Sequence, residues 1–326
     1  MRNHSRRRSL ALLVSLVLLL TGCALHKHLA QAEEAAYIDE SAQELMIVDS
    51  AEDEALRESL RLAAGMRHIL LLGVDSRPGE STGRSDAMMI VTLDPESGEI
   101  KLTSLMRDLY VEIPGRKNNR LNAAYAFGGA ELLADTIEAN FGLRIENYVA
   151  VDFSALAALI DQLGGIEADI ADENIRDRVN AVIREDNRTL GISPEDGLLE
   201  KAGLQRLTGR QAQAYARFRH GTGDGDFGRT ARQREVIGKI FDRLSGMNAL
   251  ELSALAVANL DKVRTNLGLD DILALIPALL DMKDARVSEL RIPVAGGYRD
   301  ATIDGMAVLV PDRTENKRAI GEFLTD

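Results

Sequence analysis

The chain has 326 residues, enough for one large domain with its own hydrophobic core beside shorter terminal segments. It carries 39 Lys and Arg against 51 Asp and Glu, for a net charge of -12, which argues against nucleic-acid binding because phosphate contacts need a basic surface. The only cysteine is Cys23, which excludes an internal disulfide and a cysteine-based metal cluster.

The N-terminus has the pattern of an export signal. Arginines at 2 and 6–8 precede an apolar run over 10–20, which is too short to span a bilayer. The following Leu20-Thr21-Gly22-Cys23 resembles a bacterial lipobox. We therefore expect a signal peptide over 1–22, cleavage before Cys23 and a diacylglyceryl anchor on its sulfur. The alternative is an uncleaved signal anchor extending to about Leu25, and both place the rest of the chain outside the cytoplasmic membrane.

An acidic, alanine-rich segment follows over residues 23–65. Its apolar residues give only weak amphipathic order, so we interpret it as a spacer that lifts a domain off an anionic membrane surface. Residues 66–326 are then left for that domain.

Strands and helices alternate along the remaining chain. In chain order we expect strands over 68–74, 87–93 and 100–105, a helix over 129–140 that stops at Gly142, a strand over 147–151, a helix over 154–163 and a strand over 165–170. Residues 174–197 are polar and are interpreted as a long excursion. Helices over 208–218, 229–244 and 270–280, strands over 287–292 and 307–310, and a last helix complete the chain. This mixture predicts an α/β fold with helices on both faces of a sheet.

Charged side chains recur at three predicted strand ends. Asp75 follows the first strand, Arg84 and Asp86 precede the second, and Arg107 with Asp108 follows the third. Each alone is compatible with a turn residue or a surface ion pair. If the strands are neighbours, the charges converge at a sheet edge, where α/β proteins place ligands. Two carboxylates with few other ligands suit Mg²⁺, and Mn²⁺ accepts the same oxygen donors.

A second group of charges lies between Tyr215 and Gln233. Its cations are all arginines (Arg217, Arg219, Arg229 and Arg232), which suit bidentate recognition of an oxyanion such as phosphate. Asp226 lies among them on a glycine-rich turn. A charge run of this kind is also compatible with a solvated helix face. The triplet Asp-Phe-Gly at 226–228 lacks the other kinase motifs, and Gly228 with Arg229 breaks a calcium-loop pattern.

Several motifs together resemble the LytR–CpsA–Psr family: LLGVDSR at 71–77, RSDAMM at 84–89, RD at 107–108, NAAYAFGG at 122–129, YARFR at 215–219 and DFGRTARQ at 226–233. The resemblance covers about 66–326 and implies a catalytic domain there, folded as a three-layer α/β/α sandwich around a central mixed sheet. It departs from the family pattern at Met106, where proline is usual, at Arg120-Leu121, and in the lipobox, since many members have a transmembrane anchor.

The resemblance assigns roles residue by residue. It implies Asp75 and Asp86 as Mg²⁺ ligands, and a pyrophosphate-binding set of Arg84, Arg107, Arg217, Arg219 and Arg229. Gln233, one helical turn after Arg229, would face the same head group. Asp226 would orient the arginines or accept the incoming proton. Asn122 matches a motif position, and we interpret it as the cap of the following helix.

The family's enzymes move a glycopolymer from a polyprenyl-pyrophosphate carrier to the cell wall. The expected acceptor is a peptidoglycan sugar hydroxyl, the C6 hydroxyl of N-acetylmuramic acid, and the leaving group is polyprenyl phosphate. The base stays open between Asp75, Asp108 and Asp226, and the polymer between teichoic acid, capsule and other wall polysaccharides. Two alternatives remain: a polyprenyl-pyrophosphate hydrolase, which uses the same site with water, and a non-catalytic cell-wall polymer-binding or regulatory protein.

Overall fold

The computed structural model describes residues 66–75, 84–94, 98–218, 225–259, 262–268 and 286–325. The chain forms two compact units. Of the described residues, the unit that we call the sheet unit comprises those from 66 to Ala150 and from Arg286 onward, and the unit that we call the helical unit comprises those between Val151 and Ala285.

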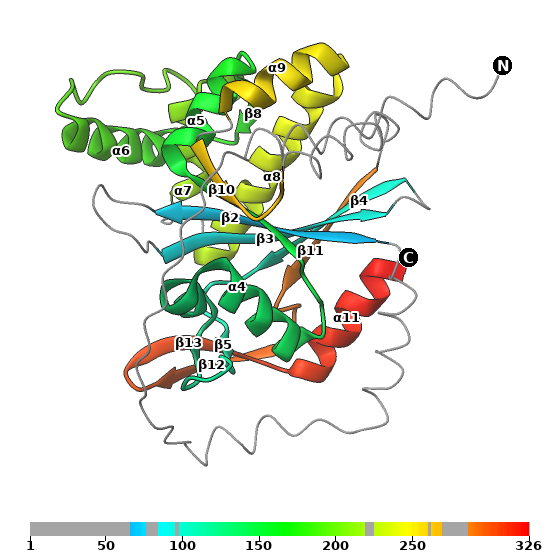
Figure 1. Ribbon diagram of the computed structural model, residues 1–326. Coiled ribbons are helices and arrows are strands. Elements are labelled where there is room, and N and C mark those ends of the chain that lie inside the picture. The colour runs from blue at the N-terminus through cyan, green and yellow to red at the C-terminus, as the bar shows by residue number, and fades with distance from the viewer. Residues whose placement is uncertain are drawn as a thin grey trace. The chain divides into compact units, whose positions relative to one another are not determined.

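The sheet unit is built on a mixed sheet (Figure 1). Its elements are β2 (Arg67–Asp75), β3 (Arg84–Asp94), β4 (Glu99–Leu105), β5 (Tyr110–Val111), β6 (Asn119–Arg120), α4 (Leu121–Phe141), β7 (Asn147–Asp152), β11 (Val287–Ile292), β12 (Tyr298–Ile303), β13 (Met306–Pro311) and α11 (Arg313–Thr325). The strands lie in the order β7-β2-β3-β4-β11. β3 is antiparallel to β2 and β4, whereas β11 is parallel to β4.

The strands β2 and β3 each contain a long apolar run, whereas β4 alternates apolar residues with Lys101 and Thr103. β2 reads RHILLLGVD, and Leu70, Leu72, Ile90 and Leu102 are fully buried. A strand that alternates apolar and polar residues usually has one face exposed to solvent, whereas a continuous apolar run is typical of a strand covered on both faces. The predictions over 68–74, 87–93 and 100–105 are confirmed by β2, β3 and β4.

Helices α4 and α11 of the same unit pack on β3 and β11 (Figure 1). α4 ends at Gly142, which adopts the left-handed conformation (φ 72°) that favours glycine, as predicted. It begins earlier than predicted, at Leu121, and is interrupted by non-helical backbone at Gly128 and Gly129. The expectation that Asn122 caps this helix is wrong, because the N-cap is Arg120, whose side chain makes no capping hydrogen bond.

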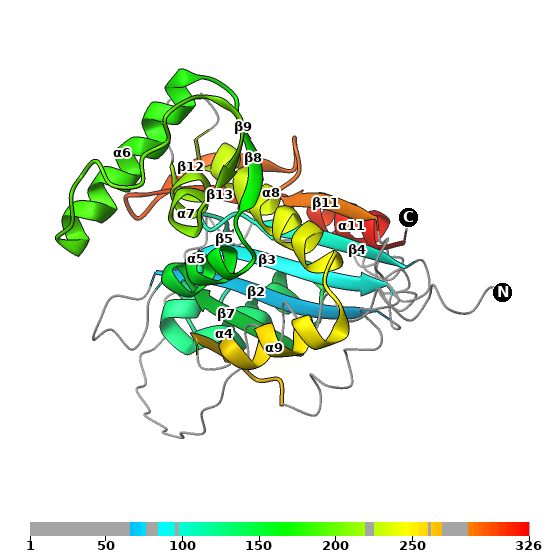
Figure 2. The same cartoon turned by 90° about the horizontal axis from the view of Figure 1, so that it is seen from above.

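The helical unit contains α5 (Phe153–Gln162), β8 (Ile166–Ile170), α6 (Glu173–Leu190), β9 (Gly203–Leu207), α7 (Gly209–Arg217), α8 (Gly225–Ser245), α9 (Ala249–Asn259) and β10 (Val263–Thr265). α7 packs against α5, α6 and α8, and β8 pairs antiparallel with β9 (Figure 2). A capping box starts α7: Thr208 accepts from the Gln211 N–H, and the Gln211 side chain accepts from the Thr208 N–H.

The polar stretch 174–197 is mostly helix rather than irregular chain. Asp172 caps α6 by accepting a hydrogen bond from the Ile175 N–H at 2.8 Å, and Gly191 ends the helix with φ 70°. The apolar part of its buried face is one residue wide, with Ile175, Val179 and Ile183 four positions apart. So narrow an apolar stripe among charged residues hides the helical period, so the polar composition alone predicts an irregular excursion where the chain forms α6.

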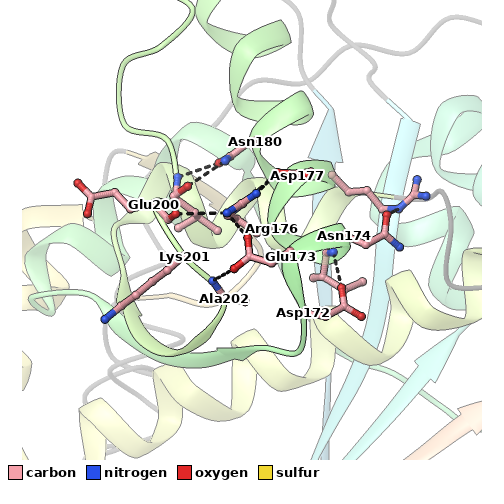
Figure 3. Close-up of polar contacts among 12 residues, drawn as sticks. Asp172, Glu173, Asn174, Arg176, Asp177, Asn180, Glu200, Lys201 and Ala202 are labelled. Atoms are coloured by element: carbon pink, nitrogen blue, oxygen red, sulfur yellow. Dashed lines mark hydrogen bonds and ion pairs between the residues drawn. The ribbon is translucent and has the colours of Figure 1, made fainter.

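The chain after α6 returns along the helix and is tied to it by two buried asparagines. Asn180 donates to the Leu199 carbonyl at 2.9 Å and accepts from the Leu199 N–H at 2.8 Å. Asn187 donates to the carbonyls of Ser193 and Asp196. Nearer the start of α6, Arg176 contacts Glu173, Asp177 and the Glu200 carbonyl (Figure 3). These contacts make α6 and its return segment one ordered arm.

The predicted α/β class, with helices flanking a central mixed sheet, is confirmed. Helix α9 and strands β5, β6, β9, β10 and β12 are elements that the sequence analysis did not identify. The predicted helix over 270–280, the signal segment over 1–22 and the spacer over 23–65 lie outside the described residues. Within the described part of the chain, no helix has the length and apolar character needed to cross a membrane.

Candidate functional site

The ends of three strands meet at one edge of the sheet unit. In the β2–β3 ladder Asp75 is the register partner of Arg84, and in the β3–β4 ladder Met89 pairs with Ser104. The end of β2, the start of β3 and the end of β4 are therefore neighbours, as the sequence analysis required. We call Asp75, Arg84, Asp86, Arg107 and Asp108 the strand-edge cluster. The side chains of Asp75 and Arg84 lie outside the described residues.

Asp86 occupies a β-bulge. Gly73 pairs with Ala87 and Val74 pairs with Ser85, so Asp86 is an extra residue on β3 with no partner on β2. A bulge bends its strand and turns one side chain out of the regular alternation, and bulges are frequent beside active sites. Gly73 permits the close approach, because a Cβ there would lie 3.0 Å from the Ala87 Cβ.

Arg107 links two carboxylates at this edge. Its Nη1 lies 2.9 Å from Oδ1 of Asp86, and its Nε lies 3.7 Å from Oδ2 of Asp108. Asp108 is also 3.4 Å from the Nε of Arg120. The side chains of Asp86 and Arg107 are each 21% exposed, so the pair is partly shielded from water and yet open to a ligand. Partial shielding makes such charges interact more strongly than fully exposed ones.

The strand-edge cluster contains carboxylates, the residue type that hard divalent cations bind. Asp86 offers a carboxylate at the strand edge, and the register places Asp75 opposite Arg84, two residues from Asp86. Mg²⁺ takes one or two carboxylates and completes its shell with water and phosphate oxygens. Among the described residues no three or more His, Cys, Asp or Glu side chains gather around one point that could hold a metal, and that search does not include the Asp75 side chain.

The helical unit carries the second group of candidate residues, of which Arg217 ends α7 while Asp226, Arg229 and Gln233 lie in α8. Arg217 is the last residue of α7, and its Nη1 lies 3.1 and 2.9 Å from the two carboxylate oxygens of Asp186 in α6. Its guanidinium carbon is 5.1 Å from the centre of the Phe153 ring, a cation–π distance.

Asp226 and Arg229 pair within the first turn of α8. The Arg229 Nη2 lies 2.7 Å from Oδ2 of Asp226, and the Arg229 side chain is 3% exposed. Asp226 is favoured in a first helical turn, where the helix dipole is positive. Gln233 lies one turn after Arg229 in the same helix and is half-buried, so the two share a helix face. Arg219 lies outside the described residues.

The chain matches the model of the LytR_cpsA_psr family over residues 27–322. It belongs to the LytR–CpsA–Psr family. Regulatory protein MsrR of Staphylococcus aureus (strain COL) is 32% identical over 265 residues, which are 80% of this chain and 75% of MsrR. A polyisoprenyl-teichoic acid–peptidoglycan teichoic acid transferase, TagU of Enterococcus faecalis, is 36% identical over 207 residues, 62% of each chain.

The fold agrees with a solved member of the family. The structure of the LytR-CPS2A-psr family protein YwtF (TagT), which has bound octaprenyl pyrophosphate lipid, superposes with a TM-score of 0.59 at 23% identity. The match covers 80% of this chain and 91% of the YwtF chain.

One arginine of the LytR–CpsA–Psr motif DFGRTARQ serves the fold directly. Arg232, 8% exposed, donates from Nη2 to the Phe218 carbonyl at 2.6 Å, and its guanidinium carbon lies 3.6 Å from the centre of the Phe218 ring. The sequence groups Arg232 with the other arginines, but in the structure it binds Phe218, the C-cap residue of α7.

Tyr215 and Asp186 make contacts that the sequence analysis did not predict. The Tyr215 hydroxyl donates to the Glu235 carboxylate at 2.8 Å and so joins α7 to α8. Burial, together with Glu235, raises the pKa of this hydroxyl, which therefore stays protonated as a donor. The YARFR motif gave a signal for Tyr215, but none pointed to Asp186, because its partner Arg217 is 31 residues away.

Proposed function

We propose that this chain is a phosphotransferase that moves a glycopolymer from a polyprenyl-pyrophosphate carrier onto a peptidoglycan sugar hydroxyl, the C6 hydroxyl of N-acetylmuramic acid. The observation that carries the proposal is the partly shielded Asp86–Arg107 pair where three strand ends meet. TagU, a transferase for teichoic acid, and YwtF (TagT), with its bound octaprenyl pyrophosphate, support the choice of reaction and carrier.

The proposed roles follow from the chemistry of pyrophosphate. Its oxygens carry closely spaced negative charge, and guanidinium groups bind such oxygens in pairs. We assign Arg84 and Arg107 of the sheet unit to this ligand, and likewise Arg217, Arg219, Arg229 and Gln233 of the helical unit. Asp226 orients Arg229 through their ion pair. Asp75 and Asp86 would hold Mg²⁺, or Mn²⁺, which when bound supplies further positive charge to the phosphate oxygens.

In the proposed reaction the acceptor hydroxyl attacks the phosphorus next to the polymer. A new phosphorus–oxygen bond forms, the bond to the bridging oxygen breaks, and polyprenyl phosphate leaves. The hydroxyl proton passes to a carboxylate, for which Asp75, Asp108 and Asp226 are the candidates. The arginines stabilise charge that grows on the leaving oxygen, so the protein contributes electrostatics and position rather than a covalent intermediate.

We also propose that the chain acts outside the cytoplasmic membrane, tethered by a diacylglyceryl group on Cys23. The lipid carrier and the wall acceptor then lie within reach of one tethered protein. Residues 23–65 would serve as the spacer and residues 66–326 as the catalytic domain.

The test incubates the purified full chain with Mg²⁺, a synthetic polyprenyl-pyrophosphate disaccharide and a peptidoglycan oligomer. Mass spectrometry follows the acceptor. We expect an acceptor heavier by one phosphosaccharide, with polyprenyl phosphate released in equal amount. Cleaved carrier beside an unchanged acceptor would mean the hydrolase instead. Tight binding of the lipid without any turnover would mean the non-catalytic alternative.

A further inference from the structure

Arg217 is held from two sides by other elements of the helical unit. The Nη1 atom of Arg217 donates to both carboxylate oxygens of Asp186 in α6, at 3.1 and 2.9 Å. Phe153, the first residue of α5, offers its ring to the guanidinium at 5.1 Å. A long side chain at the end of a helix would otherwise sample several rotamers, and these two contacts select one.

Asp186 is itself fixed by the ordered arm. The next residue, Asn187, is fully buried and binds the return segment through the carbonyls of Ser193, Pro194 and Asp196. Arg210 of α7 contacts both Asn187 and Asp196, at 3.0 Å for the Asp196 oxygen. The turn of α6 that carries Asp186 is therefore anchored to the same helix, α7, that carries Arg217.

The contact with Asp186 uses only one nitrogen of the Arg217 guanidinium, Nη1. Within the described part of the chain, the Nε and Nη2 atoms of Arg217 make no hydrogen bond, while Nη1 carries both bonds to Asp186. The Nε–Nη2 edge is one of the two edges through which arginine binds a pair of phosphate oxygens. The side chains of Arg217 and Asp186 are 32% and 30% exposed, so the pair lies partly open to solvent.

We propose that Asp186 is a positioning residue: it holds Arg217 by Nη1 so that the Nε–Nη2 edge is presented to the pyrophosphate of the lipid carrier. The inference rests on the proposed function, and it gives the α6 arm a part in binding of the head group. A preset guanidinium loses less side-chain entropy when the ligand binds, so removing Asp186 weakens binding although Asp186 touches no ligand atom.

The test measures binding of geranylgeranyl pyrophosphate to the full chain in detergent micelles by calorimetry. Asp186→Asn keeps the size of the side chain and removes its charge, and we expect the Kd to rise about tenfold. Asp186→Glu restores the charge and should recover most of the affinity. The matched control is Glu185→Gln on the next residue of α6, which is 71% exposed and pairs with Arg188 rather than Arg217. It removes the same charge and should bind like the wild type.

A double-mutant cycle separates a positioning role from a general structural one. If Asp186 acts through Arg217, then Asp186→Asn has no further effect on the Kd once Arg217→Ala is present. Wild-type affinity in Asp186→Asn, or an equal loss in both backgrounds, would overturn the inference and leave the proposed function standing. Failure of the wild type itself to bind the pyrophosphate would instead overturn the proposed function, and the inference with it.

Discussion

At the scale of single residues, Arg107 has the most direct place in the proposed chemistry among the residues whose side chains are described. Replacing it with Ala should lower kcat/KM for transfer by about 100-fold or more, the usual effect of losing one preorganised donor to developing charge. Arg107→Lys should recover only part of the activity, because an ammonium keeps the charge and loses the planar fork. The measurement is the initial rate of acceptor modification.

The matched control for Arg107 is Arg144→Ala in the same unit. Arg144 also pairs with a carboxylate, Glu146, but its side chain is 74% exposed. The Arg144→Ala variant should transfer the polymer at the wild-type rate. Full activity in folded Arg107→Ala protein would remove the strand-edge cluster from the mechanism.

His68 predicts a dependence of stability on pH. Burial lowers its pKa from 6.5 to about 4, and its Nδ1 lies 2.8 Å from the Thr92 hydroxyl. The unfolded chain takes up a proton near pH 6.5 and the folded chain only near pH 4, so this stabilisation is complete above pH 6.5 and is lost as the pH falls toward 4. The loss is on the order of 3 kcal/mol by the linkage relation.

The measurement is urea unfolding at a series of pH values between 7 and 4. His68→Gln retains hydrogen-bonding groups and does not titrate, so its free energy of unfolding should fall less over this range than that of the wild type. Carboxylates titrate in both proteins and cancel in the difference. Equal slopes for the two proteins would show that His68 is not kept neutral by folding.

At the scale of elements, a buried lysine joins the sheet to the last helix. Lys101 of β4 is 2% exposed, and its Nζ donates to the Leu324 carbonyl in the last turn of α11 at 2.8 Å. A cation there satisfies a carbonyl that has no partner inside the helix and complements the helix dipole. Lys101→Met keeps the volume and leaves that carbonyl unsatisfied, so we expect a loss of about 2 kcal/mol in the free energy of unfolding.

Thermal unfolding and limited proteolysis of the C-terminus would measure this effect. The control is Lys117→Met, at an exposed position of the β5–β6 connection, which should leave the melting temperature unchanged. A melting temperature for Lys101→Met equal to that of the wild type would mean that α11 is held by its apolar contacts alone.

The elements also show where sequence patterns were sufficient. A continuous apolar run identified β2, and Gly142 marked the end of α4, because burial and left-handed backbone leave local signals. α6 was missed although Asp172 and Gly191 flank it, since three apolar side chains at four-residue spacing give a weak period. Its stability comes from Asn180 and Asn187, whose partners lie beyond the helix and cannot be inferred from its own sequence.

At the scale of the whole molecule, sequence motifs named the candidate residues but did not predict which of them contact one another. The strand-edge contact between Asp86 and Arg107 depends on β2, β3 and β4 being neighbours, which the sequence analysis left as a condition and the register shows. The bulge that sets Asp86 apart, and the contact from Asp186 to Arg217, arise from pairings that no local pattern specifies. Spacing along the chain therefore indicates the candidate residues, and packing decides which arginines bind carboxylates and which, like Arg232, bind a backbone carbonyl.

The proposed tether gives the last prediction, because the carrier lipid is itself confined to the membrane. An enzyme held at the same surface meets that lipid at a raised effective concentration. If Cys23 is lipidated, intact mass spectrometry of the membrane-extracted protein should show a chain that begins at Cys23 and carries a diacylglyceryl group. Cys23→Ala should retain residues 1–22 and carry no lipid, whereas Ser15→Ala, within the apolar run, should be processed like the wild type. A wild-type chain that still contains residues 1–22 would establish the uncleaved signal anchor in place of the lipoprotein.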